Sequence, residues 1–258
     1  MYTDRVTILG SEVSRVTLSQ ALAKLEHWIQ QPGDRCRFIV ATGFHGIWVA
    51  HQDRAFRDII NSSDLFCPDG IAPVWLSRLR GDPLPERVAG PDLMREFIRS
   101  NRYRSFFYGD TEATLEALQH RLAVESPGHK LVGAYSPPFR PLTVPEDESV
   151  MQMINDAKPD VLWVGLGLPK QEQWIHSHMQ ELKVPVVVAV GAAFSLVSGT
   201  IKRAPQWMGN AGLEWLWRLS HEPKKLWRRD LIDGPRFVYH ALKETWEIRS
   251  AARSSTSR

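Results

Sequence analysis

The feature that most constrains the fold is a series of short, almost continuously apolar segments separated by helical patterns. The runs "DVLWVG" (160–165) and "VPVVVAVG" (184–191) have no polar face, which is typical of strands covered on both sides of a parallel sheet. Leu18, Leu22 and Leu25 instead recur at helical spacing. Strand and helix patterns alternate along most of the chain, which predicts an α/β fold with a Rossmann-like parallel sheet and helices on both faces.

The predicted elements point to where a ligand would bind. The predicted strands cover residues 37–42, 64–67, 105–109, 130–135, 160–165 and 184–191. The predicted helices cover residues 18–29, 45–62, 70–80, 92–101, 112–124, 147–157 and 170–182. Ligands of open parallel sheets bind at the carboxyl ends of the strands. The residues that follow each predicted strand are therefore the first candidates for function.

Charge divides the chain near residue 200. Residues 1–200 hold 20 Lys and Arg against 23 Asp and Glu, whereas residues 201–258 hold 12 against 6 and also half of the ten tryptophans. Interleaved basic and aromatic side chains suit an anionic surface such as phospholipid, a nucleotide diphosphate or nucleic acid, although a Trp and Leu stripe is equally typical of core packing. We predict an α/β core over residues 1–200 and a basic, Trp-rich helical appendage over residues 201–258.

Several classes of protein are disfavoured by what the sequence lacks. Cys36 and Cys67 lie in separate apolar runs and offer neither metal-ligand spacing nor a disulfide framework, so we expect a reducing cytosol. The longest apolar run is too short to span a bilayer, and "MYTDRVTILG" lacks the pattern of a signal peptide. No D-x-D motif and no His or Cys cluster is present, so the sequence predicts neither a metal nor a cofactor.

Polar side chains follow the first two predicted strands of the sheet. "VATGFHG" places Thr42 and His45 after one strand, and "FCPDGIAPVW" places Asp69 after the next. The simplest interpretation of the first stretch is a helix N-cap at Thr42 beside a half-buried His45. An Asp-Gly pair is most often only a turn, but a carboxylate at a strand end can also act as a general base toward a bound hydroxyl.

Two further stretches have features of an anion site. In "LPERVAGPDL", Arg87 precedes a predicted helix, so a guanidinium and a helix N-terminus can face the same anion; a surface arginine on a loop is equally consistent. In "VGLGLPKQEQW", Gly165 and Gly167 allow close backbone approach, and we expect free amides around Lys170 and Gln171.

This glycine turn does not fit the common nucleotide motifs. No G-x-x-x-x-G-K-[ST] motif is present, and Lys170 stands where G-x-G-x-x-G requires its last glycine, so an NAD-dependent oxidoreductase is disfavoured. A diphosphate held by amides and a lysine remains open. In "VAVGAAFSLVSGTIKRAP", Ser195 and Arg203 are further candidate contacts, whereas we expect Phe194 and Leu196 in the core.

Five motifs, in this order and spacing, resemble the WecG/TagA/CpsF glycosyltransferase family. They are "CPDGIAPVW", "LPERVAGPDL", "VGLGLPKQEQWI", "VGAAFSLVSGTIKRAPQWM" and "GLEWLWRLSHEPKKLWRR", and the resemblance covers roughly residues 5–235. It implies an enzyme of exopolysaccharide and cell-envelope synthesis that transfers a sugar from a UDP-sugar to a sugar on a polyprenyl diphosphate. The resemblance further implies inversion to a β linkage, no metal, and a peripheral position on the cytoplasmic face of the membrane.

The resemblance also implies roles for individual residues. Asp69 matches the family's general base, and Arg87, which matches a position lining the donor and acceptor pocket, is a second candidate catalytic residue. Thr42 and Gln171 match positions that line the donor and acceptor pocket. Three cations match positions that reach over the active site: Arg218, Lys225 and Arg228. There they would stabilise the departing UDP. The implied partners are the UDP-sugar, the lipid-linked acceptor and an anionic membrane surface, without nucleic acid; a homo-oligomer stays open.

Two departures from the family pattern bear on the donor sugar. Many members carry Thr-x-Asn where this chain has Thr42-Gly43-Phe44-His45, and Ser195 stands where members often carry Asp. An asparagine amide is a natural partner for an N-acetyl group, so its absence favours a hexose, with UDP-glucose as donor. The alternative is UDP-N-acetylmannosamine, or its uronic acid, acting on N-acetylglucosaminyl diphosphate undecaprenol. The alternative from another class of protein is a non-catalytic module that binds anionic membranes. Such a module would explain only the basic tail.

Overall fold

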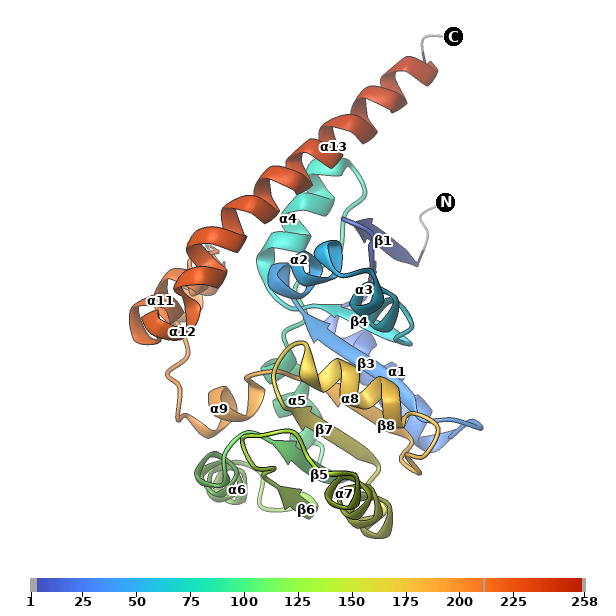
Figure 1. Cartoon of the computed structure of the whole chain (residues 1–258), viewed down its shortest axis with the longest axis vertical. Helices are drawn as coiled ribbons and strands as arrows, with labels where there is room; N and C mark the ends of the chain where they lie inside the picture. The colour runs from blue at the N-terminus through green and yellow to red at the C-terminus, as the bar shows by residue number, and fades with distance from the viewer. Residues whose placement is uncertain (1–3, 211, 257–258) are drawn as a thin grey trace.

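A parallel sheet forms the centre of the protein in the computed structural model, which describes residues 4–210 and 212–256 (Figure 1). Within these residues, six strands form this sheet in the order β4-β3-β8-β7-β5-β6, and every pairing is parallel. The strands are β3 (Arg37–Thr42), β4 (Leu65–Pro68), β5 (Arg104–Gly109), β6 (Lys130–Tyr135), β7 (Val161–Gly165) and β8 (Val186–Ala189). The predicted α/β fold is confirmed.

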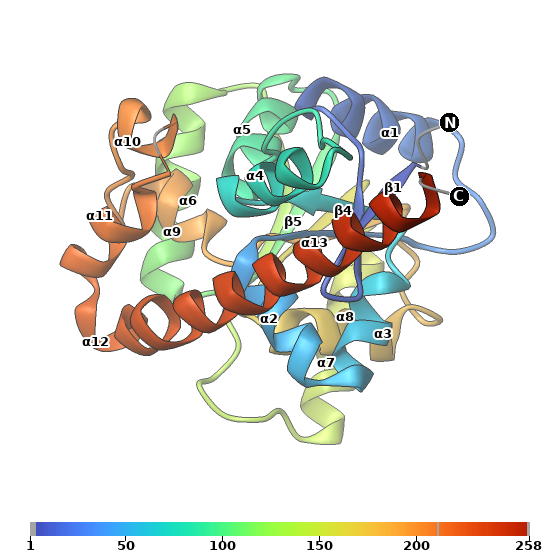
Figure 2. The same cartoon turned by 90° about the horizontal axis from the view of Figure 1, so that it is seen from above.

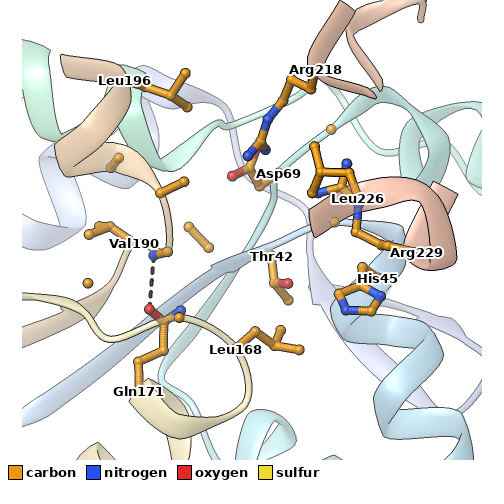
Figure 3. A pocket seen from close by; sticks show the side chains of 18 of the residues that line it. Thr42, His45, Asp69, Leu168, Gln171, Val190, Leu196, Arg218, Leu226 and Arg229 are labelled. Carbon is orange, nitrogen blue, oxygen red and sulfur yellow. Dashed lines mark hydrogen bonds between the residues drawn. The ribbon is translucent and has the colours of Figure 1, made fainter. Parts of the chain in front are cut away.

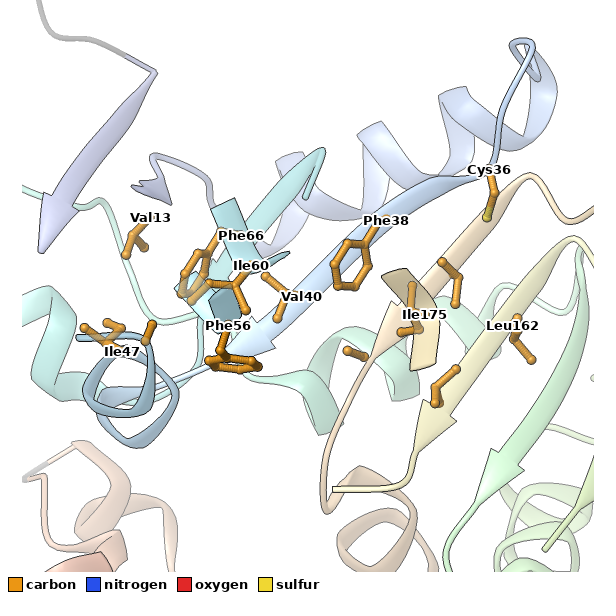
Figure 4. Packing of buried hydrophobic residues seen from close by; sticks show 14 of the residues in the cluster. Val13, Cys36, Phe38, Val40, Ile47, Phe56, Ile60, Phe66, Leu162 and Ile175 are labelled. Carbon is orange, nitrogen blue, oxygen red and sulfur yellow. The ribbon is translucent and has the colours of Figure 1, made fainter. Parts of the chain in front are cut away.

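Helices cover both faces of this sheet (Figures 1 and 2). Alternate strand residues feed two apolar layers, so that Phe38 of β3 belongs to one layer and Ile39 to the other. The first layer packs against α2 (Phe44–Gln52), α3 (Arg54–Asn61), α4 (Ile71–Arg80), α7 (Val144–Ala157) and α8 (Lys170–His178). The second packs against α1 (Leu18–Gln30), α5 (Gly90–Arg99), α6 (Glu112–Glu125) and α9 (Ala193–Ser198). Figure 4 shows Phe56 and Ile60 of α3 in the first layer. Burial on both faces explains the continuously apolar strands.

Two predicted elements differ in the structure, and one observed element was not predicted. Residues 45–62 form two helices, because the Asp53 carboxylate accepts a hydrogen bond from the Phe56 amide (3.1 Å) and caps the second. The helix predicted over residues 170–182 ends at His178. No sequence pattern predicted the N-terminal hairpin of β1 (Arg5–Ile8) and β2 (Ser11–Ser14), whose strands are too short to show a clear alternation.

The C-terminal segment is helical, as predicted, and it packs on the sheet domain. Its elements are α10 (Gln206–Asn210), α11 (Glu214–His221), α12 (Pro223–Arg228), the π-helical turn η1 (Arg229–Asp233) and α13 (Gly234–Thr256). Helix α13 crosses α2 and α4 (Figure 2), and its Phe237 and Ala241 are buried in the first apolar layer. Arg80 of α4 pairs with Glu244 and donates from Nε to the Thr245 hydroxyl (2.9 Å). That residues 1–200 form a separate unit stays a prediction.

Exposed apolar side chains lie along one side of this segment. Leu231, Val238, Leu242 and Trp246 follow one another at helical spacing and are each 45–72% exposed. Among the helices in the described ranges, none is both long enough and apolar enough to cross a bilayer. The segment therefore presents an apolar stripe without being a transmembrane helix.

Candidate active site

A cleft of about 1740 Å³ opens at the carboxyl ends of the strands, between the sheet and the C-terminal segment. In Figure 3, Thr42, Asp69 and Gln171 enter the cleft from the sheet side, and Arg218 and Arg229 enter from the C-terminal helices. The structure brings together nearly all residues predicted from the sequence. Those that line the cleft are Thr42, His45, Asp69, Arg87, Gly165, Gly167, Lys170, Gln171, Ser195, Arg203, Arg218 and Lys225. Arg228 does not line the cleft; it is exposed, and Arg229 lies there in its place.

The loops after β3 and β4 hold each other by backbone contacts. The Asp69 amide donates to the Thr42 carbonyl (3.0 Å), and a Cβ on Gly43 would lie 1.9 Å from the Asp69 carbonyl oxygen. Only glycine therefore fits at position 43. The predicted cap at Thr42 is wrong: Gly43 is the N-cap of α2, and the buried Thr42 side chain packs against Gly46. This contact fixes Asp69 relative to Thr42.

Asp69 has the properties of a general base. Among the described residues, the carboxylate accepts only a long hydrogen bond, from the Gly90 amide to Oδ2 (3.4 Å). Burial and the negative charge of Glu214 raise the pKa of Asp69 to about 6, against the opposing effects of Arg87, Gly90 and Arg218. Such a carboxyl group is ionised at neutral pH and is more basic than an ordinary aspartate.

Arg87 belongs to an ion network at the edge of the cleft. Its Nη1 lies 2.7 Å from Oε2 of Glu214 on α11, and its Nη2 lies 3.9 Å from Oδ2 of Asp92 on α5. Asp92 also binds Arg203, whose Nη2 donates to Oδ2 (2.7 Å). Arg87 is therefore a positioned cation of the cleft and not a loose surface arginine. Glu214 was not predicted as a site residue, although it lies within the motif "GLEWLW".

The glycine turn after β7 approaches its neighbours closely, as predicted. A Cβ on Gly165 would lie 2.8 Å from the Phe194 ring, whereas Gly167 has φ of +80° and open space around it. The expected free amide at Gln171 is wrong, because this amide donates to the Gly167 carbonyl (3.0 Å). The loop therefore offers the cleft room for a ligand but not the Gln171 backbone N–H.

The Gln171 side chain joins the loops that follow β7 and β8. Its Oε1 accepts from the Gly191 amide (3.0 Å), and its Nε2 donates to Oε1 of Glu172 (2.8 Å). Glu172 is fully buried, and burial raises its pKa to about 7. These bonds fix the orientation of the Gln171 amide at the wall of the cleft (Figure 3).

Other residues near this turn differ in position. Nζ of Lys170 lies 5.7 Å from the centre of the Phe139 ring at the mouth of the cleft. Phe194 is buried in the core as expected, but Leu196, also expected there, is half-buried and lines the cleft. Ser195 donates from Oγ to Oδ2 of Asp110 (2.6 Å), a cleft residue that the sequence did not indicate.

The C-terminal segment supplies cations to the opposite wall of the cleft. Arg218, Lys225 and Arg229 line this wall, and the Arg229 guanidinium carbon lies 5.9 Å from the centre of the Phe44 ring. Helix α12 ends at Arg228 and the wider π-helical turn begins at Arg229, a change of register that sequence periodicity does not reveal. His45 lies beside Arg229; burial and the Arg229 charge lower its pKa.

Comparison with known proteins agrees with this geometry. A model of the glycosyl transferase WecG/TagA/CpsF family matches residues 6–251. An N-acetylglucosaminyldiphosphoundecaprenol N-acetyl-beta-D-mannosaminyltransferase of Bacillus subtilis (strain 168) is 34% identical over 200 residues, which are 76% of this chain and 75% of the relative. A protein of the same name from Staphylococcus aureus (strain MW2) is 29% identical over 252 residues, 96% of each chain. Fold, cleft and sequence thus agree that the chain belongs to the WecG/TagA/CpsF family of glycosyltransferases.

Proposed function

We propose that the protein transfers an N-acetylmannosaminyl group from its UDP-linked form to N-acetylglucosaminyl diphosphate undecaprenol, with inversion to a β linkage. The names of the relatives support this donor group and this acceptor over the glucose transfer expected from the sequence. The observation that carries the chemistry is Asp69, a basic carboxylate at a strand end, facing a cleft that also holds Arg87.

In the proposed reaction Asp69 takes the proton of the acceptor hydroxyl while the hydroxyl oxygen attacks the anomeric carbon of the donor sugar. The bond from that carbon to the diphosphate breaks, and its electron pair leaves with UDP. Arg87, Arg218 and Lys225 stabilise the charge that develops on the diphosphate, because preplaced cations act without reorganisation.

His45 lies one residue after the position of the asparagine found in many family members, which is Phe44 in this chain, and can take its role. Its Nδ1 is buried and has no hydrogen-bond partner among the described residues, and the side chain lines the cleft. An imidazole nitrogen in this state can donate to an acetamido oxygen or accept from a hydroxyl, depending on its tautomer. The departure from the Thr-x-Asn pattern is therefore compatible with an N-acetylated donor.

We also propose that the C-terminal segment docks on the cytoplasmic face of the membrane that holds the lipid acceptor. The exposed stripe of Leu231, Val238, Leu242 and Trp246 supports this, together with the net positive charge of residues 201–258. Because Arg218 and Lys225 of the same segment line the cleft, docking would bring the active site to the lipid-linked sugar.

The decisive experiment is a UDP-release assay over a panel of UDP-sugars with N-acetylglucosaminyl- and glucosyl-diphosphate lipid acceptors. We expect release with UDP-N-acetylmannosamine and the N-acetylglucosaminyl lipid, and a loss of about 10²- to 10⁴-fold in Asp69→Asn. Asp58→Asn, an exposed site on α3 outside the cleft, is the matched control. Turnover only with UDP-glucose and the glucosyl lipid would restore the glucose hypothesis. Vesicle binding without UDP release from any donor would favour the binding-module alternative.

A further inference from the structure

One carboxylate in the cleft has no part in the proposed chemistry. Asp110 directly follows β5 and has φ of +58°, a left-handed conformation that is unfavourable for most residues other than glycine and that Asp and Asn tolerate best. Its amide donates to the Gly165 carbonyl (3.0 Å), and its carbonyl accepts from the Ser136 hydroxyl (2.8 Å). Hydrogen bonds at its amide and its carbonyl thus hold the Asp110 backbone in this unusual conformation.

The Asp110 carboxylate is oriented by two donors and keeps acceptor capacity. Oδ1 accepts from the Thr111 amide (2.8 Å), and Oδ2 accepts from the Ser195 hydroxyl (2.6 Å). Each carboxylate oxygen can accept more than one hydrogen bond, and the half-buried side chain lines the cleft. A negative group there repels a diphosphate and attracts hydroxyl donors.

Strand order gives the distance of Asp110 from the general base. Asp69 follows β4 and Asp110 follows β5, and the sheet order β4-β3-β8-β7-β5 puts four strand spacings between them. At about 4.8 Å for each spacing, the ends of β4 and β5 are about 19 Å apart along the sheet edge. A nucleotide sugar carries its sugar, diphosphate and nucleoside in a row. With the anomeric carbon near Asp69, the diphosphate crosses the middle strands, where Gly167 leaves open space, and the nucleoside reaches β5.

We infer that Asp110, oriented by Ser195, binds the ribose hydroxyls of the donor nucleotide. This inference rests on the proposed function, which supplies the UDP-linked donor. A carboxylate at a strand end of a Rossmann-like sheet suits a ribose diol because it accepts hydrogen bonds from adjacent hydroxyls.

The inference also accounts for Ser195, where many family members carry Asp. An aspartate at position 195 would lie within hydrogen-bond distance of the Asp110 carboxylate and be repelled by it, whereas serine donates to it.

Calorimetric titration with UDP, 2′-deoxy-UDP and 3′-deoxy-UDP tests the inference without lipid or donor sugar. The unaltered chain is expected to bind UDP at least about tenfold more tightly than one of the deoxy analogues, since hydrogen bonds to a charged group contribute about 1.5–3 kcal/mol. Asp110→Asn keeps a residue type that tolerates the left-handed backbone. This variant should bind UDP about tenfold more weakly than the unaltered chain does, and it should bind the deoxy analogue with the same affinity as the unaltered chain. Ser195→Ala should weaken UDP binding by a smaller factor, about two- to tenfold.

Glu112→Gln is the matched control, because Glu112 is an exposed acid in the first turn of α6 outside the cleft; its UDP affinity should equal that of the unaltered chain. Equal affinity for UDP and both deoxy analogues in the unaltered chain overturns the inference, whatever the stability of the variants. So does UDP binding by Asp110→Asn with undiminished discrimination. Neither result contradicts the proposed function, because the protein still binds UDP. An unaltered chain that does not bind UDP at all refutes the proposed function as well.

Discussion

Asp69→Asn should stabilise the protein at neutral pH while it destroys turnover. Burial and Glu214 disfavour the ionised carboxylate in the folded state, so its pKa is about 6 there against 3.8 for an unperturbed group. The folded pKa lies above the unfolded one. Ionised Asp69 therefore destabilises the folded state. This destabilisation is absent below pH 4, grows between pH 4 and 6, and is complete above pH 6.

The size of the effect follows from the two pKa values. A difference from 3.8 to about 6, at about 1.36 kcal/mol for each unit, gives at most about 3 kcal/mol, and partial solvent exposure of Asp69 reduces the expected gain to about 1–3 kcal/mol. An asparagine keeps an acceptor for the Gly90 amide and carries no charge. In a chain of this length each kcal/mol corresponds to about 2–4 °C in Tm.

Thermal unfolding at pH 4.0 and pH 7.5 measures this difference. The variant should melt several degrees above the unaltered protein at pH 7.5 and close to it at pH 4.0. Asp92→Asn provides a control of opposite sign: burial raises the pKa of Asp92, but its bond to Arg203 outweighs this and lowers it, so the variant should lose stability at pH 7.5. If Asp69→Asn is destabilised equally at both pH values, the electrostatic argument for this site is refuted. Near-normal turnover would show that another group is the base.

Two further changes test the roles of the C-terminal segment. Glu214→Gln removes a charge that raises the pKa of Asp69, so the acid limb of the kcat/KM profile, expected near pH 6, should move to lower pH. The control Glu247→Gln, at an exposed position, should leave this limb in place. An unmoved acid limb in Glu214→Gln would contradict the coupling between Glu214 and Asp69. Trp246→Glu should weaken binding to vesicles containing anionic lipid and slow turnover with the lipid acceptor at unchanged UDP affinity. Val124→Glu, an equally exposed apolar residue on α6, should do neither, and equal vesicle binding by both variants would remove α13 from the docking surface.

The sequence predicted the fold well because the relevant signal is local. Strands buried on both faces are apolar at every position, and "DVLWVG" shows this without knowledge of its neighbours. The rule that ligands bind at strand ends then selected Thr42, Asp69 and Gln171, which the structure places around one cleft. Local signals failed where one side chain interrupts a pattern, as Asp53 does between α2 and α3.

The unpredicted site residues depend on contacts between distant parts of the chain. Glu214 meets Arg87 across 127 positions, and Ser195 meets Asp110 across 85. No periodicity or spacing reports such pairs, because only the folded sheet brings their loops together. Arg229 was missed for another reason, since a π-helical turn changes which of two adjacent arginines lies at the cleft. The donor sugar was not predicted in agreement with the names of the relatives, because the missing asparagine at position 44 indicated the loss of an amide but not that the imidazole of the adjacent His45 also lines the cleft.

The contact between Gly43 and the Asp69 carbonyl has a consequence for how such enzymes diversify. It holds Asp69, the proposed base, at the end of the sheet, because almost any side chain at position 43 would collide with the Asp69 backbone. Positions 45, 110 and 195 carry ordinary side chains on α2, directly after β5 and on α9, and they are free of that restriction. Substitutions at these three positions can therefore change the lining of the cleft while leaving the contact that holds Asp69 in place.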